Sequence, residues 1–166
     1  METPFDKFTQ KMYRRYDGRP TFKYPDDRLL PLRDIISEEL MRHPDMLNRD
    51  DEPCLLVIKS GNATGVTIGR ATGVFSYVRE YFPDNTHKTS MEWAICNYDN
   101  TSRVFSAPGD SGSIIVDGLG RIGGLLTGRS GITETSDITY ATPWFWLFER
   151  IKANGFPDAH LDPVIA

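Results

Sequence analysis

The segment that decides the fold is FSAPGDSGSIIVDGLGRIGGLLTG, which runs from Phe105 to Gly128. Its core is Gly-Asp-Ser-Gly, and glycines on both sides of an Asp-Ser pair permit a tight turn that bulky residues could not follow. In such a turn the backbone amides of Gly109 and Ser111 can point together into a small anion-binding concavity. We therefore expect Ser111 to be a nucleophile beside an oxyanion hole, and Asp110 to turn inward and hold the loop.

A plain surface turn between two strands is the alternative interpretation of this motif, and the sequence around it decides between the two. The motif is not the Gly-x-Ser-x-Gly elbow of α/β-hydrolases, because its fifth position is Ser113. The segment before the motif is not a clean parallel strand either. The flanking elements therefore have to come from another fold.

Those flanking elements are mostly short β-strands. Runs rich in Val, Ile, Thr and aromatic residues alternate with turn signals from Cys54 onward, and they cover residues 54–60, 63–70, 73–82, 90–98, 113–117, 121–128 and 137–142. About seven short strands at this spacing are typical of a sandwich or a barrel. The glycines of GNATGVTIGRATG are not a phosphate loop, because no Gly-Lys-Ser/Thr follows them. We expect a mainly β fold.

Two helices are predicted at the ends of this β-rich part. Leu29, Leu32, Ile36 and Leu40 recur at helical spacing until Pro44. The second helix occupies residues 142–155, with Thr142 as its cap, Pro143 at its first position and Asn154-Gly155 at its end. The chain thus divides into a leader with one amphipathic helix (1–53), a β-rich part with its terminal helix (54–155) and a tail (156–166).

Composition narrows the class of protein. The chain has 166 residues, 39% of them hydrophobic, which suits one domain with a real core. A net charge of −4 argues against nucleic acid or an anionic membrane surface as the main partner. The polar N-terminus lacks the apolar core of a signal peptide, so we expect a cytoplasmic protein. The two cysteines, Cys54 and Cys96, are then expected to be reduced thiols. No cluster has the spacing of metal ligands, and no cofactor is predicted.

Residues 105–128 resemble the nucleophile loop and following hairpin of chymotrypsin/trypsin-like serine proteases, the peptidase S1-like family. Residues 137–155, with Tyr140, are similar to the last strand and terminal helix of that family, and residues 59–73 are similar to the opening strands of its second barrel. The resemblance covers Leu55 to Gly155. The whole chain most resembles the C-terminal part of fungal trypsin-like proteins of unassigned role. The resemblance implies a chymotrypsin-like antiparallel β-barrel, corresponding to the second barrel of the two-barrel fold of that family.

The resemblance also implies a substrate-binding surface for a peptide or protein. Phe105 matches the base of the primary specificity pocket of the family, and Ser106 its wall. Leu126, Thr127 and Gly128 would offer backbone hydrogen bonds to an extended peptide. An aspartate at the base selects basic side chains, so Phe105 implies a shallow apolar pocket without a trypsin-like preference. An ordinary core aromatic remains the alternative for Phe105.

A general base for Ser111 is not found in the sequence. The family order is His, Asp, Ser, and only His43 precedes Ser111 with aspartates following it. It lies too close to the serine for a barrel to fit between them, while His87 and His160 match no position of the triad. The chain is thus interpreted as an endopeptidase domain, truncated and lacking its own His-Asp pair, or as an inactive protease-like domain that binds peptide or protein. Self-association or a missing N-terminal barrel is the expected partner.

Overall fold

A computed structural model describes Thr9, Lys11, Asp27 and residues 29–48, 50–131 and 137–161 of the chain. Its elements are β1 (Asp34–Ile35), α2 (Glu38–Arg42), β2 (Leu55–Gly61), β3 (Gly65–Ala71), β4 (Phe75–Tyr81), β5 (His87–Asn97), β6 (Ile114–Asp117), β7 (Arg121–Ser130), β8 (Ile138–Pro143) and α3 (Trp144–Ala153). The predicted mainly β fold with a helix on either side is confirmed. Apart from the three isolated residues, the first 28 residues of the predicted leader (1–53) lie outside the described residues, as does the end of the predicted tail, 162–166.

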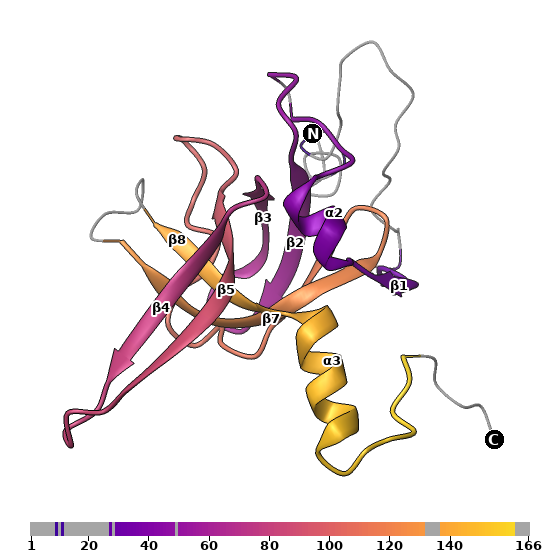
Figure 1. The fold of residues 1–166 in the computed structure, drawn as a ribbon. Helices are drawn as coiled ribbons and strands as arrows, with labels where there is room; N and C mark the ends of the chain where they lie inside the picture. Colours follow the sequence, from indigo (N-terminus) through magenta and orange to yellow (C-terminus); the bar gives the residue numbers. More distant parts are fainter. Residues whose placement is uncertain are drawn as a thin grey trace.

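The strands form one sheet that closes on itself (Figure 1). Its order is β1-β7-β6-β2-β3-β5-β4, and β8 pairs with both β5 and β7. The strands β7, β6, β2, β3, β5 and β8 therefore make a closed ring of six antiparallel neighbours. All seven strand segments predicted between Cys54 and Thr142 are present.

Strand β2 is buried on both of its faces, which explains its unbroken apolar run. Leu55 and Val57 point into one core cluster, whose largest member is the fully buried Trp93. Leu56 and Ile58 alternate onto the other face and pack in a second cluster. A strand buried on both faces reads as continuous hydrophobic sequence rather than as an alternation.

The N-terminal helix is much shorter than predicted. It covers Glu38–Arg42, and the Ser37 hydroxyl accepts the first-turn amide of Leu40. The residues before it are extended, because β1 pairs in parallel with β7. Leu29 and Leu32 are consequently exposed, whereas Ile36 is fully buried. The predicted helix over Leu29 to Leu40 was wrong in its first half, because strand pairing fixes that part of the chain.

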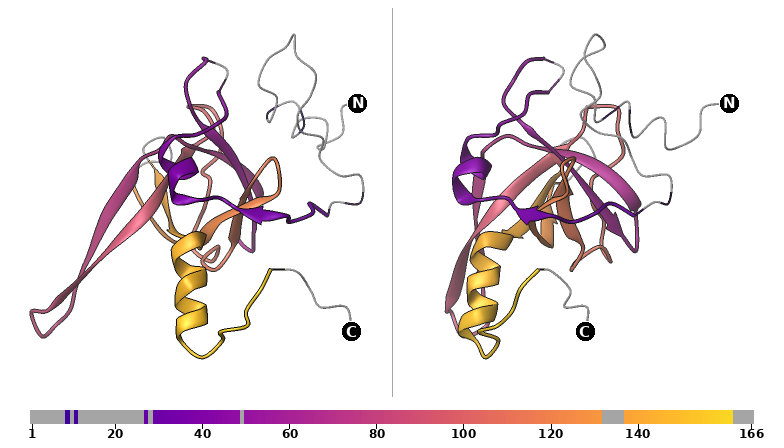
Figure 2. Two further views of the ribbon diagram at one scale, coloured as in Figure 1. Left: turned by 45° about the vertical axis from the view of Figure 1, so that its right-hand side comes forward. Right: turned by 90° about the vertical axis from the view of Figure 1, so that its right-hand side faces the viewer.

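The C-terminal helix α3 occurs where it was predicted, and it lies against β7 at one end of the ring (Figure 2). Its N-cap residue is Pro143 rather than Thr142, and no side chain caps the first turn. The Thr142 hydroxyl donates instead to the buried Glu92 carboxylate on β5, at 3.0 Å. At the other end Asn154 is the C-cap, and Gly155 follows with φ of +105°, as the predicted stop requires.

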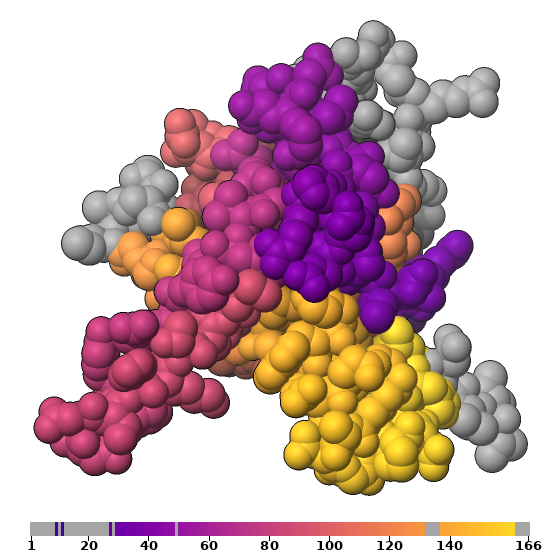
Figure 3. All heavy atoms as spheres, in the orientation of Figure 1, coloured from indigo at the N-terminus to yellow at the C-terminus, as the bar shows by residue number. Residues whose placement is uncertain are grey.

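The hairpin of β4 and β5 extends away from the ring as an arm (Figures 1 and 3). Its strands pair from Phe75–Trp93 out to Tyr81–His87, whereas β8 reaches β5 only at Trp93 and beyond. The Asp84 carboxylate closes the tip by accepting the amide and hydroxyl of Thr86. The outer part of the arm is therefore a two-stranded ribbon with no third strand among the described residues.

The two cysteines agree with the expectation from the sequence. Both cysteines are free thiols, as predicted, and burial raises the pKa of the Cys54 thiol to about 11. A thiol with so high a pKa is a poor nucleophile at neutral pH. Among the described residues, none of the helices is long and apolar enough to span a membrane.

Candidate active site

The Gly-Asp-Ser-Gly motif forms a compact turn between the buried Ser106 and strand β6. The Asp110 amide donates to the Ala107 carbonyl at 3.0 Å, and the Ser113 amide donates to the Asp110 carbonyl at 3.1 Å. Gly109 has a φ of +103°, a conformation that residues with a Cβ rarely adopt. The glycine of the motif at this position is thus required by the backbone.

Asp110 is turned inward and completely buried under this turn. Its Oδ1 accepts the amides of Ala63 and Thr64 at 2.7 and 3.2 Å. Its Oδ2 accepts the Ala107 amide at 3.0 Å and the Thr64 hydroxyl at 2.6 Å. A methyl group on Gly61 would overlap this carboxylate, so glycine at the end of β2 makes room for it. One side chain therefore ties the serine turn to the β2–β3 turn.

Lys59 completes the buried cluster, and sequence reasoning did not single it out. Its Nζ lies 3.2 Å from Asp110 Oδ2, and both side chains are fully buried. The same ammonium donates to Thr64 Oγ1 at 2.5 Å and to the Gly65 carbonyl at 3.2 Å. All three of its N–H bonds thus have acceptors. The only sequence signal was a charged residue inside the otherwise apolar run CLLVIKS.

The cluster keeps Asp110 ionised. Burial raises the pKa of Asp110, but the hydrogen bonds from Thr64, Ala107, Ala63 and Lys59 outweigh it and hold the pKa far below its usual value. Burial also lowers the pKa of Lys59, while the hydrogen bond and charge of Asp110 act in the opposite direction. An anion held by five donors has no free lone pair directed at a substrate. Asp110 therefore anchors the turn.

Ser111 is exposed on top of the turn and lines an open cavity of about 550 Å³. Its hydroxyl has no hydrogen-bond partner among the described residues, and the amides of Gly109 and Ser111 donate to no acceptor there. Apolar side chains from β2, β3, β6 and residues 30–32 form part of the cavity wall. Its lining residues are Leu30, Leu32, Ile58, Lys59, Ser60, Asn62, Val66, Gly109, Ser111, Gly112, Ser113, Ile114 and Val116.

None of the three histidines is among the residues that line this cavity. His43 is the C-cap of α2, and its side chain is 75% exposed with Nε2 lying 3.8 Å from a Glu39 carboxylate oxygen. His87 stacks obliquely on Tyr81 in the β4–β5 arm, and His160 is exposed after α3. The described residues therefore place no imidazole beside Ser111.

None of the predicted substrate-binding residues lines the cavity. Phe105 is fully buried in the main core cluster, and its carbonyl accepts the Thr67 hydroxyl at 2.7 Å. Ser106 is also buried, with its hydroxyl 2.7 Å from that of Thr139. Of the two interpretations of Phe105, this packing favours the core aromatic.

Leu126, Thr127 and Gly128 lie on β7 next to the serine turn. The Gly112 amide donates to the Leu126 carbonyl at 2.8 Å, and the Leu126 amide donates to the Ser113 carbonyl at 3.0 Å. The backbone groups of Leu126 are thus already paired with the turn itself. Thr127 is skipped in the β7–β8 register, and from Gly128 onward β7 pairs with β8 alone. The other edge of this short stretch has no described strand beside it.

The similarities found among known proteins are to solved structures. No family model matches the sequence, and no curated protein is similar to it. Five chains of solved structures match. One of them is a chymotrypsin from Cellulomonas bogoriensis, at a TM-score of 0.41 and 25% sequence identity, with 61% of this chain and 47% of that chain covered. This chain therefore spans about half the length of the chymotrypsin that it matches.

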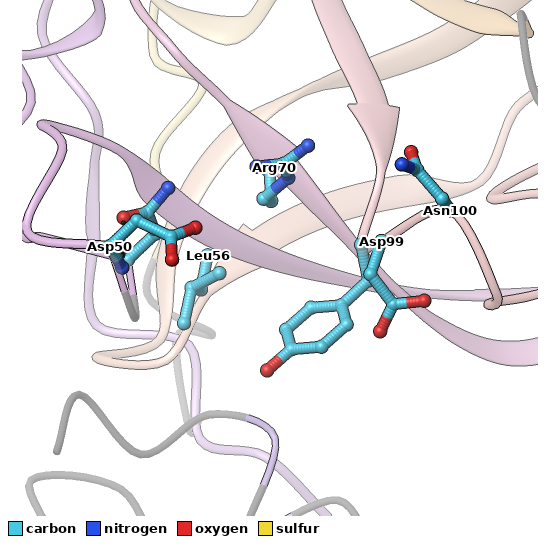
Figure 4. A pocket seen from close by; sticks show the side chains of 7 residues that line it. Asp50, Leu56, Arg70, Asp99 and Asn100 are labelled. Atoms are coloured by element: carbon cyan, nitrogen blue, oxygen red, sulfur yellow. Dashed lines mark hydrogen bonds between the residues drawn. The ribbon is translucent and has the colours of Figure 1, made fainter.

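A second, smaller pocket of about 210 Å³ lies beside β2 and β3 (Figure 4). Arg70 lies between Asp50 and Leu56 on one side and Asp99 and Asn100 on the other in this view. None of the predicted site residues lines this pocket. No group of three or more potential metal ligands occurs in the described part of the chain.

Asp137, just before β8, is a buried carboxylate with unusual surroundings. Neither of its oxygens has a hydrogen-bond partner, and its nearest cation is Arg129, whose Nε lies 3.5 Å from Oδ1. Burial raises the pKa of Asp137, and the charge of Arg129 lowers it only in part. The carboxyl group of Asp137 therefore binds its proton more tightly in the folded chain than in the unfolded chain.

Replacing Asp137 with asparagine should raise the free energy of unfolding at neutral pH by about 1 kcal/mol, because the buried charge is removed. Wild-type stability should gain as the pH falls from about 7 toward 4, since a raised pKa means that the folded state takes up a proton first. The variant should lack this part of the pH dependence. Thermal unfolding across that range measures both, and a destabilised variant at neutral pH would show that the pairing with Arg129 outweighs the burial.

Proposed function

We propose that this chain carries the nucleophile half of a serine-protease site of the chymotrypsin-like class, acting on an extended peptide. The observation that carries the proposal is the anchored turn. A fully buried carboxylate fixes the loop from below, so that an exposed Ser111 and two unpartnered amides lie together at the surface of a cavity. Surface turns have no need of such an anchor.

In the proposed reaction Ser111 Oγ attacks the carbonyl carbon of the scissile peptide bond. The amides of Gly109 and Ser111 stabilise the oxyanion, and each such donor commonly contributes about 3–4 kcal/mol to lowering the barrier. A base accepts the serine proton and returns it to the leaving amine, and water then hydrolyses the acyl-enzyme. Since no described imidazole lines the cavity, the base has to come from another segment or another polypeptide.

The free edge of β7 is the proposed binding strand for the peptide. An extended peptide that adds there would be held by backbone hydrogen bonds beyond Leu126, beside the serine turn. Phe105 is too deeply buried to touch its side chains. In this arrangement selectivity comes from the apolar cavity wall, which has no buried acid to favour lysine or arginine.

A fluorophosphonate probe, with and without free imidazole as an external base, tests the proposal. The purified chain should react slowly alone and at least about tenfold faster with imidazole, because the hydroxyl is presented but has no base. Ser111→Ala should abolish the labelling. Ser60→Ala, a serine in the same cavity wall, is the matched control and should leave it unchanged.

A second candidate is an inactive domain that binds peptide or protein, and the isolated Ser111 hydroxyl favours it. That candidate predicts no Ser111-dependent labelling under either condition. Binding of a fluorescent extended peptide would then persist in Ser111→Ala, without any cleavage in mass spectra. Imidazole-dependent labelling would exclude this candidate.

A further inference from the structure

The arm formed by β4 and β5 is the feature of the molecule that the proposed site does not use. Beyond Glu92 it is a two-stranded ribbon, and such ribbons are marginally stable in water without further packing. Large aromatic side chains are nevertheless exposed on it, with Tyr77 at 77% and Tyr81 at 73% exposure. Figure 3 shows the arm standing clear of the rest of the molecule. Exposed aromatic side chains on a protruding ribbon mark an interaction surface.

Among the residues that the structure describes, no strand pairs with the outer edge of β4. β4 is the last strand of the sheet order, and β5 is its one neighbour among the described strands. A row of unpaired amides and carbonyls on an edge is a template for another strand. The edge of β5 is free over a shorter stretch, because β8 already pairs with β5 from Trp93 onward.

We propose that β4 pairs antiparallel with β4 of a second copy of this chain, joining the two arms into one four-stranded ribbon. Self-pairing places a two-fold axis through a single residue of the strand, because both strands must keep the same face. An axis through Arg79 or Glu80 would set like charges opposite each other, which is destabilising. An axis through Val78 avoids this.

The Val78 register is self-complementary in its side chains. It sets Val78 against Val78 of the second copy at the centre. On either side Tyr77 meets Arg79 of the second copy, an aromatic–cation pair. Ser76 then meets Glu80, whose carboxylate has no hydrogen-bond partner among the described residues and accepts a hydroxyl. Every exposed charge of this strand therefore gains a favourable neighbour in this register.

Cysteine cross-linking tests the register directly. In antiparallel pairs the opposed Cα atoms lie about 4.5–5.5 Å apart, within the range that a disulfide bridges. Val78→Cys should therefore form a disulfide-linked dimer under mild oxidation. Ser90→Cys is the matched control, because Ser90 is directly opposite Val78 on β5 and shares its face, but β5 would be an outer strand of the proposed ribbon, away from the two-fold axis. A dimer from Ser90→Cys and none from Val78→Cys would overturn the proposal.

Sedimentation of charge variants tests the interface without cross-linking. The wild type should be in monomer–dimer equilibrium, and Val78→Lys or Val78→Glu should weaken the dimer by more than about tenfold through like-charge contact on the axis. An equimolar mixture of the two variants should restore a dimer. A wild type that stays monomeric at every concentration, or a mixture that does not associate, would contradict β4 pairing. Fluorophosphonate labelling of Ser111 should not change in these variants, because Val78 does not line the cavity, so the two proposals can fail separately.

Discussion

Asp110→Asn should lower the free energy of unfolding by about 3–5 kcal/mol, the cost of breaking a buried ion pair by removing one partner. The asparagine would leave the Lys59 ammonium fully buried with two neutral acceptors, Thr64 Oγ1 and the Gly65 carbonyl. Urea unfolding at neutral pH measures the loss. The same variant should lose imidazole-dependent labelling of Ser111, because the turn is no longer anchored.

Replacing the other partner of the ion pair, in Lys59→Met, should lower the free energy of unfolding by less than Asp110→Asn does. Comparing the two losses is the control for this prediction. The Asp110 carboxylate would keep its hydrogen bonds from Ala63, Thr64 and Ala107. These donors would still stabilise its buried charge after the Lys59 ammonium is removed. The pKa of Asp110 is lower in the folded chain than in the unfolded chain. Asp110 therefore stabilises the fold at pH values above its unfolded pKa of about 3.9, and this stabilisation is lost as the pH falls through its folded pKa. The gap between wild type and Asp110→Asn should therefore shrink in acid. A larger loss in Lys59→Met would contradict this account.

Phe105→Ala should also be strongly destabilising, by about 3–5 kcal/mol, as for other fully buried aromatic residues replaced by alanine. The ring packs in the main core cluster, close enough to β3 that a Cβ on Gly69 would lie 2.8 Å from it. Thermal unfolding measures the effect, and Phe105→Leu should cost much less because it leaves a smaller cavity.

Phe156→Ala is the matched control, since Phe156 is 66% exposed, and it should change stability little. A specificity role for Phe105 predicts a different pattern. In that case Phe105→Ala would keep its stability and change which peptides bind. Near-wild-type unfolding of Phe105→Ala would therefore overturn the core assignment.

The strands could be predicted because each is a short apolar run bounded by clear turns. Even β2, buried on both faces, was recognisable from its continuous hydrophobic residues and the Ser60–Gly61 turn signal. The N-terminal helix was less predictable. The helical spacing of Leu29 and Leu32 with Ile36 arises in an extended segment, where pairing with β7 decides the backbone, and such pairing leaves no local signal. Thr142 was predicted to cap α3, but its hydroxyl donates to the Glu92 carboxylate. That contact joins residues far apart in the sequence, so it too leaves no local signal.

The candidate site also contains residues whose positions local sequence predicts and residues whose positions depend on tertiary packing. Ser111 and the inward Asp110 follow from local turn chemistry, so the motif alone predicted where each side chain would lie. Lys59 could not be found, because its partner is Asp110, 51 positions further along the chain, and only tertiary packing joins them. The burial of Phe105 is likewise a property of the ring interior, and sequence spacing from Ser111 does not encode it.

The double pairing of β8 has a consequence for biosynthesis. The ring closes only when β8 inserts between β5 and β7, so residues 138–143 complete a structure whose other strands are made earlier. During translation the edges of β5 and β7 would stay open until the ribosome has released that stretch. Long-range strand pairing of this kind is slow, and open edges associate with other chains. Synthesis of this protein should therefore depend on holding-type chaperones until β8 has emerged.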